Sequence, residues 1–267
     1  MNYTPADHSF VLCAHGESPY LEECLRSLTE QSVKTGIILA TSTPSAFLEE
    51  TAERYGVPLK VNPEKGGGIG ADWNFALAQG KGKLVTLAHQ DDFYEARYAE
   101  SMLEGMNRAA DPILWFCDYR EIRGQETVEE NRNLRIKRMM LAPLKARSLQ
   151  GSRLIRRRIL SLGSPVCCPA VTYVKEKVGE APFSREMKVS LDWDQWERLS
   201  RKKGAFVYCP ERLMRHRIHE GSATTALIAD SVRDREDLMM FRRFWPGPVA
   251  RFWAKKYSKS EESNRLE

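Results

Sequence analysis

The feature that most constrains the fold is a regular alternation of apolar and amphipathic stretches between Phe10 and His89. Short apolar runs, typical of buried strands, take turns with stretches whose apolar residues recur at helical spacing. This β-α-β-α-β-α-β order predicts parallel strands joined by right-handed crossovers. Ligands of such sheets bind beyond the carboxyl ends of the strands, so the residues after each apolar run are the first candidates for a site. The apolar runs are FVLCA, GIILATS, PLKVN and LVTLAH, and the helical stretches are SPYLEECLRSLTEQS, PSAFLEETAERYG and GADWNFALAQGKG.

The alternation weakens after Asp92. We expect one more helix from about Ala96 to Arg108 and one more strand from Ile113 to Tyr119. Between Asn131 and Lys175 the sequence has no Asp or Glu, although Arg and Lys are frequent. A stretch this one-sided needs open solvent or an anionic neighbour, such as nucleic acid, an acidic glycan, a lipid diphosphate or a membrane surface.

Composition and cysteine spacing indicate the compartment. The 42% hydrophobic content supports a core, and no apolar run approaches the roughly 18 residues needed to span a bilayer. The N-terminal stretch MNYTPADHSF has neither the basic start nor the apolar region of a secretion signal, so we expect a cytoplasmic protein. None of the six cysteines forms a Cys-x-x-Cys pair, so we expect buried, reduced thiols and no zinc or disulfide framework.

Two adjacent carboxylates follow the fourth apolar run, in the stretch His89-Gln90-Asp91-Asp92. Carboxylates at a strand end can hold a hard divalent cation, which prefers oxygen ligands and often bridges to substrate phosphates. Such a cation stabilises the charge that develops on a leaving diphosphate. The alternative is that one aspartate caps the next helix and the other is solvated.

These motifs, in this order, resemble the family 2 glycosyltransferases with the GT-A fold. The resemblance rests on FVLCAHGESPYLEECLRSL, GGGIGADWNFAL and LVTLAHQDDFY, and it extends to about Thr225. It implies an α/β fold with a Rossmann-like, mostly parallel central sheet flanked by helices, a C-terminal acceptor-side region and a helical tail. We expect a glycosyltransferase domain over 1–232, with a nucleotide-sugar-binding half over about 1–119 and an acceptor-binding half over about 120–232. Residues 233–267 would form a basic, aromatic tail.

By this resemblance, the donor nucleotide binds to loops at the strand ends. Thr41 stands where many members have an aspartate that reads the uracil edge, so the base preference stays open between UDP and dTDP. His89 stands where many have the first acid of the Asp-x-Asp-type motif. The glycines Gly66 to Gly70 would form a permissive loop before a helix. The nucleotide-sugar-binding residues implied are Ala14, His15, Gly16, Glu17, Thr41, Asp72, Asn74, His89, Gln90, Asp91 and Arg217.

The resemblance also implies a divalent cation, Mn²⁺ or Mg²⁺, held by Asp91, Asp92 and His219. The stretch MRHRIHEGSAT is similar to the family's Arg-x-His…Ser loop, which Arg217, His219 and Ser222 match. Arg217 would pair with phosphate oxygens, and His219 would lie near the metal or the phosphate. An imidazole favours softer ions than an all-oxygen site, so the identity of the metal stays open.

The second acidic stretch, SLDWDQW, is the candidate for a catalytic base. An inverting sugar transfer needs a group that takes the proton of the acceptor hydroxyl. The resemblance assigns this role to Asp192, with Asp194 as the competing candidate. Either carboxylate could instead only stabilise a helix start through the helix dipole. Trp193 and Trp196 would stack on sugar rings or pack in the core.

The function that these features imply is the transfer of a sugar, with inversion, from a nucleotide-diphosphate sugar to a hydroxyl acceptor. The acceptor would be a glycan or a lipid-linked molecule of cell-surface polysaccharide biosynthesis, and we expect no nucleic acid partner. The basic region Arg135 to Arg158 and the tail could bring the protein to the inner face of the membrane; the tail could equally pack on the domain or on a second subunit. The alternatives are a metal-dependent nucleotidyltransferase and a non-catalytic binding protein on the same scaffold.

Overall fold

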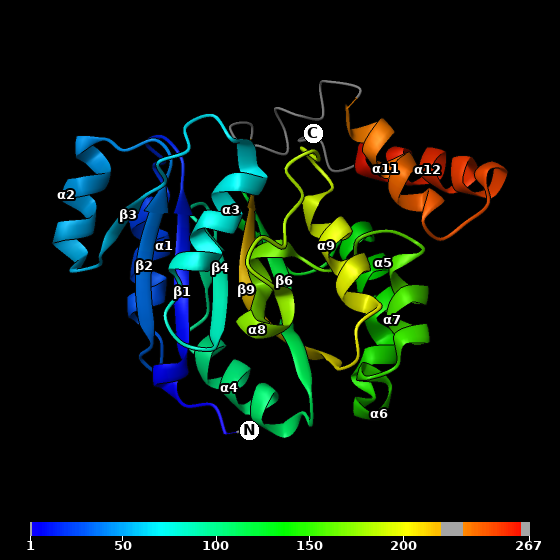
Figure 1. The fold of residues 1–267 in the computed structure, drawn as a ribbon, viewed down its shortest axis with the longest axis horizontal. Coiled ribbons are helices and arrows are strands. Elements are labelled where there is room, and N and C mark those ends of the chain that lie inside the picture. Colours follow the sequence, from blue (N-terminus) through cyan, green and yellow to red (C-terminus); the bar gives the residue numbers. More distant parts are fainter. Residues whose placement is uncertain (1, 220–231, 263–267) are drawn as a thin grey trace.

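The computed structural model describes residues 2–219 and 232–262, and in this part the chain forms one mixed sheet with helices on both faces (Figure 1). The strand order is β3-β2-β1-β4-β8-β6-β9-β5, and β7 pairs with β6. The α/β architecture predicted from the sequence is confirmed. The strands are β1 (His8–Ala14), β2 (Gly36–Thr41), β3 (Leu59–Val61), β4 (Leu84–His89), β5 (Phe93–Tyr94), β6 (Pro112–Arg123), β7 (Glu126–Val128), β8 (Val171–Val174) and β9 (Ala205–Ile218).

The first four strands in sequence are parallel, as their alternation with helices predicts. β1 pairs with β2 on one side and with β4 on the other, so that Phe10 lies opposite both Ile37 and Thr86. Their carboxyl ends therefore meet at one edge of the sheet, which is the upper edge in Figure 1. This places the residues after β1, β2 and β4 side by side.

The other half of the sheet mixes directions. β8 is antiparallel to both β4 and β6, and β6 runs parallel to the long strand β9. The carboxyl end of β9 therefore points to the same edge as that of β4. The short strand β5 then pairs with β9, with Phe93 opposite Arg215. As a result, the end of β9 lies beside the segment that follows β4.

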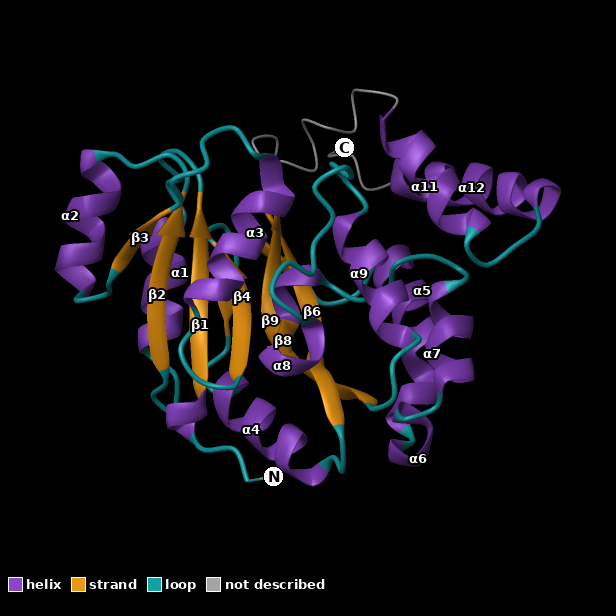
Figure 2. Ribbon diagram, in the orientation of Figure 1, coloured by secondary structure: helices purple, strands orange, loops and turns teal. Residues whose placement is uncertain are grey.

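Helices cover both faces of the sheet (Figure 2). Alternate residues of each strand point to opposite faces. Phe10 and Leu12 join the core with α1, α2 and α4, whereas Val11 joins the core with α3, α7, α9 and α11. The helices are α1 (Leu21–Thr29), α2 (Ala46–Tyr55), α3 (Gly68–Gln79), α4 (Tyr98–Arg108), α5 (Arg132–Leu141), α6 (Arg147–Gln150), α7 (Arg153–Leu160), α8 (Lys175–Val178), α9 (Leu191–Ser200), α11 (Val232–Arg242) and α12 (Gly247–Glu262).

The C-terminal helices pack on the domain. Phe241 of α11 is fully buried, and its ring meets that of Trp193 of α9 at 4.9 Å between centroids. Trp245, between α11 and α12, donates a hydrogen bond from Nε1 to the Ser161 carbonyl at 2.7 Å. Of the alternatives that the sequence left for the tail, the structure shows packing on the domain. Trp193 and Trp196 are themselves core residues, 1% and 0% exposed, so they do not stack on a sugar.

The sequence predicted free, buried cysteines and no membrane-spanning segment. All six cysteines are free thiols, and four of them are buried. Within the described residues, no helix combines the length and the apolar character needed to cross a membrane.

Candidate active site

Asp92 is the most enclosed carboxylate at the upper edge of the sheet. Its side chain is almost fully buried, and its Oδ1 atom lies 2.9 Å from His216 Nδ1. The same oxygen accepts a hydrogen bond from the backbone N–H of Arg217 at 3.0 Å. The other oxygen, Oδ2, is buried and has no hydrogen-bond partner in the described part of the chain. Two residues of β9 therefore hold Asp92 and leave one carboxylate oxygen available.

Asp91 is more open, with 23% of its side chain exposed. Its Oδ1 atom accepts a hydrogen bond from Ser18 Oγ at 2.8 Å. Its Oδ2 atom lies 3.2 Å from His219 Nε2. The carboxylate thus faces both the loop after β1 and the end of β9, which is the arrangement that the shared edge of β1, β4 and β9 produces.

Arg217 is already engaged by protein groups. Its Nη2 atom lies 2.6 Å from Glu23 Oε2, and its Nε atom donates to the Asp91 carbonyl at 3.0 Å. The guanidinium also lies 4.2 Å from the centre of the Tyr20 ring. A donor phosphate would therefore have to compete with Glu23 for Arg217.

The imidazoles on this edge have different electrostatics. Burial lowers the pKa of His89, so this ring is neutral at physiological pH. Burial would also lower the pKa of His216, but the adjacent Asp92 carboxylate outweighs it and the pKa is raised. His216 therefore tends to carry a charge that neutralises Asp92, while His89 stacks at 5.2 Å on Trp73 of α3.

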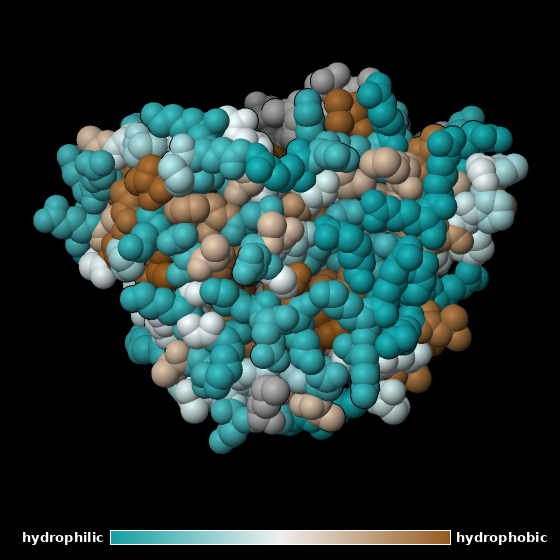
Figure 3. Space-filling model, in the orientation of Figure 1, coloured by the Kyte–Doolittle hydropathy of each residue, from teal (hydrophilic) through white to brown (hydrophobic). Residues whose placement is uncertain are grey.

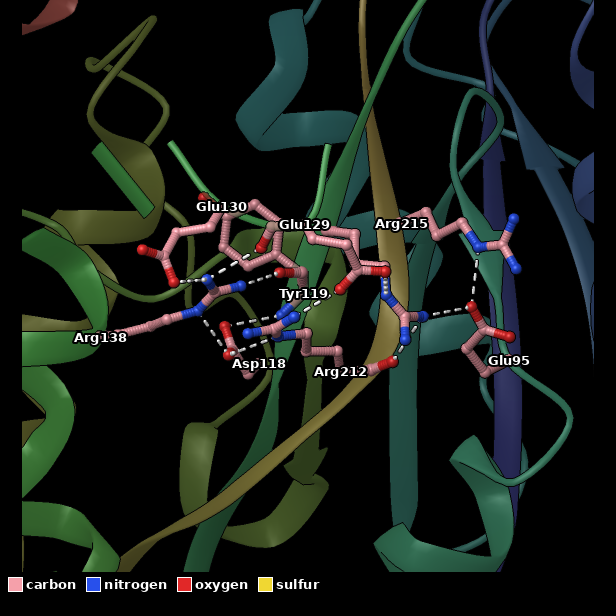
Figure 4. Close-up of polar contacts among 9 residues, drawn as sticks. Glu95, Asp118, Tyr119, Glu129, Glu130, Arg138, Arg212 and Arg215 are labelled. Atoms are coloured by element: carbon pink, nitrogen blue, oxygen red, sulfur yellow. Dashed lines mark hydrogen bonds and ion pairs between the residues drawn. The ribbon is translucent and has the colours of Figure 1, made fainter. Parts of the chain in front are cut away.

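A ladder of ion pairs braces β9, the strand that carries His216 (Figure 4). Glu95, just after β5, lies 2.7 Å from Arg215 of β9 and 2.9 Å from Arg120 of β6. At the other end of the ladder, Asp118 of β6 lies 2.7 Å from Arg138 of α5. The ladder ties β5, β6, β9 and α5 together beneath His216 and Arg217.

The loops predicted to bind the nucleotide are tied to one another. Gln90 exchanges two hydrogen bonds with the backbone of His15, at 3.1 and 3.0 Å. Gly16 has a φ of 63° and donates its N–H to Thr43 Oγ1 at 2.8 Å. Thr41 Oγ1 in turn accepts from the Thr43 N–H at 3.0 Å. Ala14 ends β1 and is buried, whereas Glu17 is exposed. The structure thus joins the ends of β1, β2 and β4 into one rim.

Asp72 and Asn74, both on α3, lie in different surroundings. Asp72 accepts hydrogen bonds from Ser42 Oγ and Asn62 Nδ2, both at 2.9 Å, and so belongs to the rim at the end of β2. Asn74 uses its amide oxygen and nitrogen on the backbone of Phe183, at 2.9 and 2.8 Å. The structure therefore places Asn74 at the loop before α9 and does not bring it to Asp91.

The glycine-rich stretch is shorter as a loop than the sequence suggested. Gly66 and Gly68 have φ angles of 74° and 79°, as expected for permissive glycines. However, α3 begins at Gly68, so Gly68 to Gly70 belong to its first turn. A Cβ atom on Gly70 would collide with the Ser184 carbonyl, so this glycine allows α3 to approach the loop before α9.

Asp192 lies in the first turn of α9 and is half-buried. Its Oδ1 atom accepts the Trp193 N–H at 2.6 Å. Burial raises the pKa of Asp192 to about 6, although Arg233 and Lys137 oppose the shift. A carboxylate with such a pKa is ionised near neutral pH and is more basic than an ordinary aspartate, which suits proton abstraction.

Asp194, the competing candidate, is held differently. It is 3% exposed, and its carboxylate lies 2.6 Å from Arg198 Nη2 and 2.6 Å from Arg243 Nη1. Among the described residues Asp192 has no ion pair of this kind. Two arginines therefore neutralise Asp194, which favours Asp192 as a base.

The charges of the two acidic centres act on the same buried groups. Burial raises the pKa of the Cys167 thiol, and the charges of both Asp92 and Asp192 add to the increase. The same two carboxylates, with Asp192 the stronger, act on the Cys168 thiol after burial. Lys137 of α5 also influences both Asp192 and His216. Asp92 and Asp192 therefore both act on the charge of the vicinal cysteines Cys167 and Cys168.

The donor atoms at the upper edge fit a cation that shares its ligands with a substrate. Within the described residues, no group of three or more His, Cys, Asp and Glu side chains is arranged to hold a metal ion. Asp91 and His219 nonetheless present two donor atoms to one place, and Asp92 keeps one buried oxygen without a partner. Mg²⁺-type sites often use one or two carboxylates and take the remaining ligands from phosphates and water.

Sequence reasoning missed three contributors to this edge. Ser18 lies ahead of α1, which begins at Leu21, and its hydroxyl donates a hydrogen bond to Asp91 Oδ1. The partnerships of His216 with Asp92 and of Glu23 with Arg217 depend on β9 returning to β4, which no local pattern indicates. Ser222, which the sequence matched to a family loop, lies outside the described residues.

The comparisons with known proteins agree with this architecture. A family model described as glycosyl transferase family 2 matches residues 9–179. The putative glycosyltransferase EpsH of Bacillus subtilis (strain 168) is 28% identical over 120 residues, which cover 43% of this chain and 34% of EpsH. This chain therefore spans about a third of that curated relative.

Solved glycosyltransferase structures share the fold. S. aureus TarS 1–349 in complex with UDP-GlcNAc is 14% identical and has a TM-score of 0.61, covering 91% of this chain and 69% of its own. The mannosyltransferase PcManGT from Pyrobaculum calidifontis, in complex with GDP-Man and Mn²⁺, is 12% identical with a TM-score of 0.60 and covers 98% of this chain and 76% of its own. The chain has the GT-A architecture of these structures.

Proposed function

Because this chain belongs to glycosyl transferase family 2, we propose that it transfers a sugar from a nucleotide-diphosphate sugar to a hydroxyl acceptor, with inversion at the anomeric carbon. The observation that carries the proposal is the pair of acidic centres, one at the carboxyl ends of the parallel strands and one in the first turn of α9. Asp192 has the elevated pKa of a base and no ion pair among the described residues, and Asp91 and Asp92 lie where a leaving diphosphate would bind. Family membership supports sugar transfer, and the surroundings of these carboxylates support the roles proposed for them.

In this proposal Asp192 takes the proton of the acceptor hydroxyl as its oxygen attacks the anomeric carbon from the side opposite the diphosphate. The bond between that carbon and the diphosphate oxygen breaks, and the nucleoside diphosphate leaves with the bonding electrons. A bound divalent cation would stabilise the negative charge of the leaving group. Asp91, Asp92 and His219 would hold the cation, and His216 and Ser18 would orient the two carboxylates.

For the donor, we propose a nucleoside diphosphate of the UDP or dTDP type on the rim formed by the ends of β1, β2 and β4. Two similar structures are complexes with nucleotide sugars, TarS with UDP-GlcNAc and PcManGT with GDP-Man and Mn²⁺. Arg217 would bind phosphate after exchanging Glu23 for it. The rim residues would be Ala14, His15, Gly16, Glu17, Thr41, Asp72, His89, Gln90 and Asp91. Asn74 would act indirectly, by fixing the loop at Phe183.

For the acceptor, we propose that residues of about 120–232 form its binding half and that about 1–119 form the donor half. A lipid-linked acceptor would bring the protein to the cytoplasmic face of an anionic membrane, in a pathway of cell-surface polysaccharide synthesis. In support, six of the seven exposed large apolar side chains of the described residues lie on α5, α7, α11 and α12, among them Leu154 at 77% and Phe252 at 61% exposed. Apolar groups show at the edge near α7 in Figure 3.

These helices also carry exposed arginines, such as Arg135 and Arg153. Exposed apolar and basic side chains together bind anionic bilayers. Sedimentation with phosphatidylglycerol vesicles, but not with phosphatidylcholine vesicles, is the expected result. The matched variant Leu154→Ser should weaken sedimentation. Equal sedimentation with both lipids would contradict a role for the arginines in membrane binding.

The reaction is tested by product analysis with a panel of nucleotide sugars and Mn²⁺ or Mg²⁺. We expect release of a nucleoside diphosphate, and Asp192→Asn should abolish this release while leaving nucleotide binding intact. Release of pyrophosphate or of a nucleoside monophosphate would instead identify a nucleotidyltransferase. Binding without turnover of any donor would identify a non-catalytic binding protein.

A further inference from the structure

We propose that Glu236 of the C-terminal helix α11 is a positioning residue for the base Asp192, so that α11 is part of the catalytic machinery. The proposal rests on the proposed function in one respect, the role of Asp192. It goes beyond the family match, which ends at residue 179 and so includes neither residue.

The contact is a carboxylate that accepts three consecutive backbone N–H groups. Glu236 is 6% exposed, and its Oε1 atom accepts the N–H of Lys188 at 2.8 Å. Its Oε2 atom accepts those of Val189 and Ser190, both at 2.9 Å. The next residue, Asp237, accepts the Ser190 hydroxyl at 2.9 Å. Two adjacent acids of α11 therefore fix the segment that leads directly into α9.

This contact lies immediately before α9. The helix begins at Leu191, and its N-cap residue Ser190 makes no side-chain capping bond of its own. The first N–H groups of a helix lack partners within it and carry a partial positive charge, which a carboxylate satisfies and stabilises. Glu236 binds one of these groups, the N–H of the N-cap residue Ser190, and also the two N–H groups ahead of it, so the segment that enters α9 depends on α11.

The base lies in that first turn. Asp192 is two residues beyond Ser190, and its Oδ1 atom is held by the Trp193 N–H at 2.6 Å. A loose first turn would move this carboxylate, and a displacement of about 1 Å can lower turnover about 100-fold. Arg233, also on α11, acts on the charge of Asp192 together with Lys137 of α5. Helix α11 thus influences both the position and the basicity of Asp192.

The remaining packing of α11 makes the contact testable. Met240 and Phe241 are fully buried in the core that contains Trp193, so α11 should stay docked when Glu236 is changed. Glu236→Gln removes the charge and one acceptor atom while keeping the shape. Asp234→Asn is the matched control, because Asp234 is an exposed acid of the same helix that bonds Ser258 of α12.

Hydrogen exchange of the full chain measures the contact without any substrate. In Glu236→Gln, the amides of residues 188–190 should exchange at least about tenfold faster, while those of the buried strand β1 stay unchanged. Asp234→Asn should exchange like the wild type at both places. Unchanged exchange at 188–190 in a folded Glu236→Gln protein would overturn the proposal.

Turnover is measured as UDP or GDP released from UDP-GlcNAc or GDP-mannose with Mn²⁺. We expect Glu236→Gln to lower kcat about 10- to 100-fold and to change KM for the donor less than about threefold. In the pH profile of kcat, the acid limb should move away from about pH 6. A purely structural role would lower the active fraction but leave this limb in place, and that result would also overturn the proposal. If Glu236→Gln does not fold, Glu236→Asp is measured in its place. This variant keeps the charge, but its side chain is one methylene too short to reach all three N–H groups. The same results would support or overturn the proposal.

The double variant separates this proposal from the proposed function. If Glu236 acts through Asp192, then Glu236→Gln should not lower any further the residual turnover left in the Asp192→Asn enzyme. Full activity of Asp192→Asn would refute the assigned base, whatever Glu236 does. An inactive Asp192→Asn enzyme with a fully active Glu236→Gln enzyme would refute the positioning role alone.

Discussion

The two acidic centres of this molecule are built in different ways. The centre at Asp91 and Asp92 is assembled mainly from loops that follow neighbouring parallel strands, and its partners include Ser18 after β1. The centre at Asp192 stands at the start of α9, a carboxylate from α11 holds the segment that leads into this helix, and α11 follows the whole sheet in sequence. Short strand-loop-helix units thus supply the carboxylates and Ser18 of the first centre, to which β9 adds His216 and Arg217, and contacts between distant segments form the second.

The two centres therefore depend on different parts of the fold. The donor-side centre needs the sheet alone, since parallel strands bring their carboxyl ends together and β9 brings His216 and Arg217 to Asp92. The base-side centre needs the C-terminal helices to be docked. We therefore expect damage to the tail to impair the base first, and damage to the strand-end loops to impair nucleotide binding first.

The largest effect on this comparison should come from Phe241→Ala. Phe241 is fully buried against Trp193 and Tyr257, with ring centroids 4.9 and 5.7 Å away. Removing a buried phenylalanine side chain costs about 3–5 kcal/mol of unfolding free energy. Denaturant unfolding measures the loss. Phe252→Ala on α12, where the ring is 61% exposed, is the control and should stay within about 0.5 kcal/mol of the wild type. Equal, small losses in both variants would make the tail an independent appendage.

The fold could be predicted as far as local patterns determine it. The alternation from Phe10 to His89 gave four parallel strands, because each strand and its helix bury one another within a short stretch of chain. β8 and the long pairing of β6 with β9 were not predicted. Their neighbours are far away in sequence, and Val171–Val174 is too short to show a period.

The next effect should come from Asp91→Ala, on the other side of the comparison. Asp91 links Ser18 and His219 and offers an exposed carboxylate to a cation. Losing such a group weakens metal-dependent binding about 10- to 100-fold, or about 1.4–2.8 kcal/mol. Titration with UDP, with and without Mn²⁺, measures the loss. Glu22→Gln, which removes an exposed acid paired with Arg54, is the control and should bind as the wild type does. UDP affinity that is equal with and without Mn²⁺ in the wild type would contradict the metal site.

The candidate site shows the same division. Asp91, Asp92 and the loop after β1 were expected together, and the structure brings them together because they share an edge. Glu236 carried no signal in the sequence, since an acid in a basic, aromatic tail resembles any solvated residue. Its partners are backbone N–H groups, which every non-proline residue has, so only the packing of α11 could reveal them.

The smallest effect, and the one most specific to the base, is on stability. Burial raises the pKa of Asp192 to about 6, against 3.8 in an unfolded chain. The folded state therefore binds the proton more tightly, and the stabilisation this gives is complete below pH 3.8 and is lost as pH rises to about 6. Above that pH the wild type keeps a half-buried charge, which costs about 1–2 kcal/mol after allowance for solvent screening.

Asp192→Asn should consequently raise Tm by a few degrees at pH 7.5, where the wild type is ionised, and hardly at all at pH 3.8. Asp194→Asn provides a control of opposite sign, because Asp194 is paired with Arg198 and Arg243 and its loss leaves two arginines without a carboxylate. Two aspartates on one helical turn would then respond to the same substitution in opposite directions. A loss of stability in both variants at pH 7.5 would mean that Asp192 also serves the fold, and would weaken its assignment as the base.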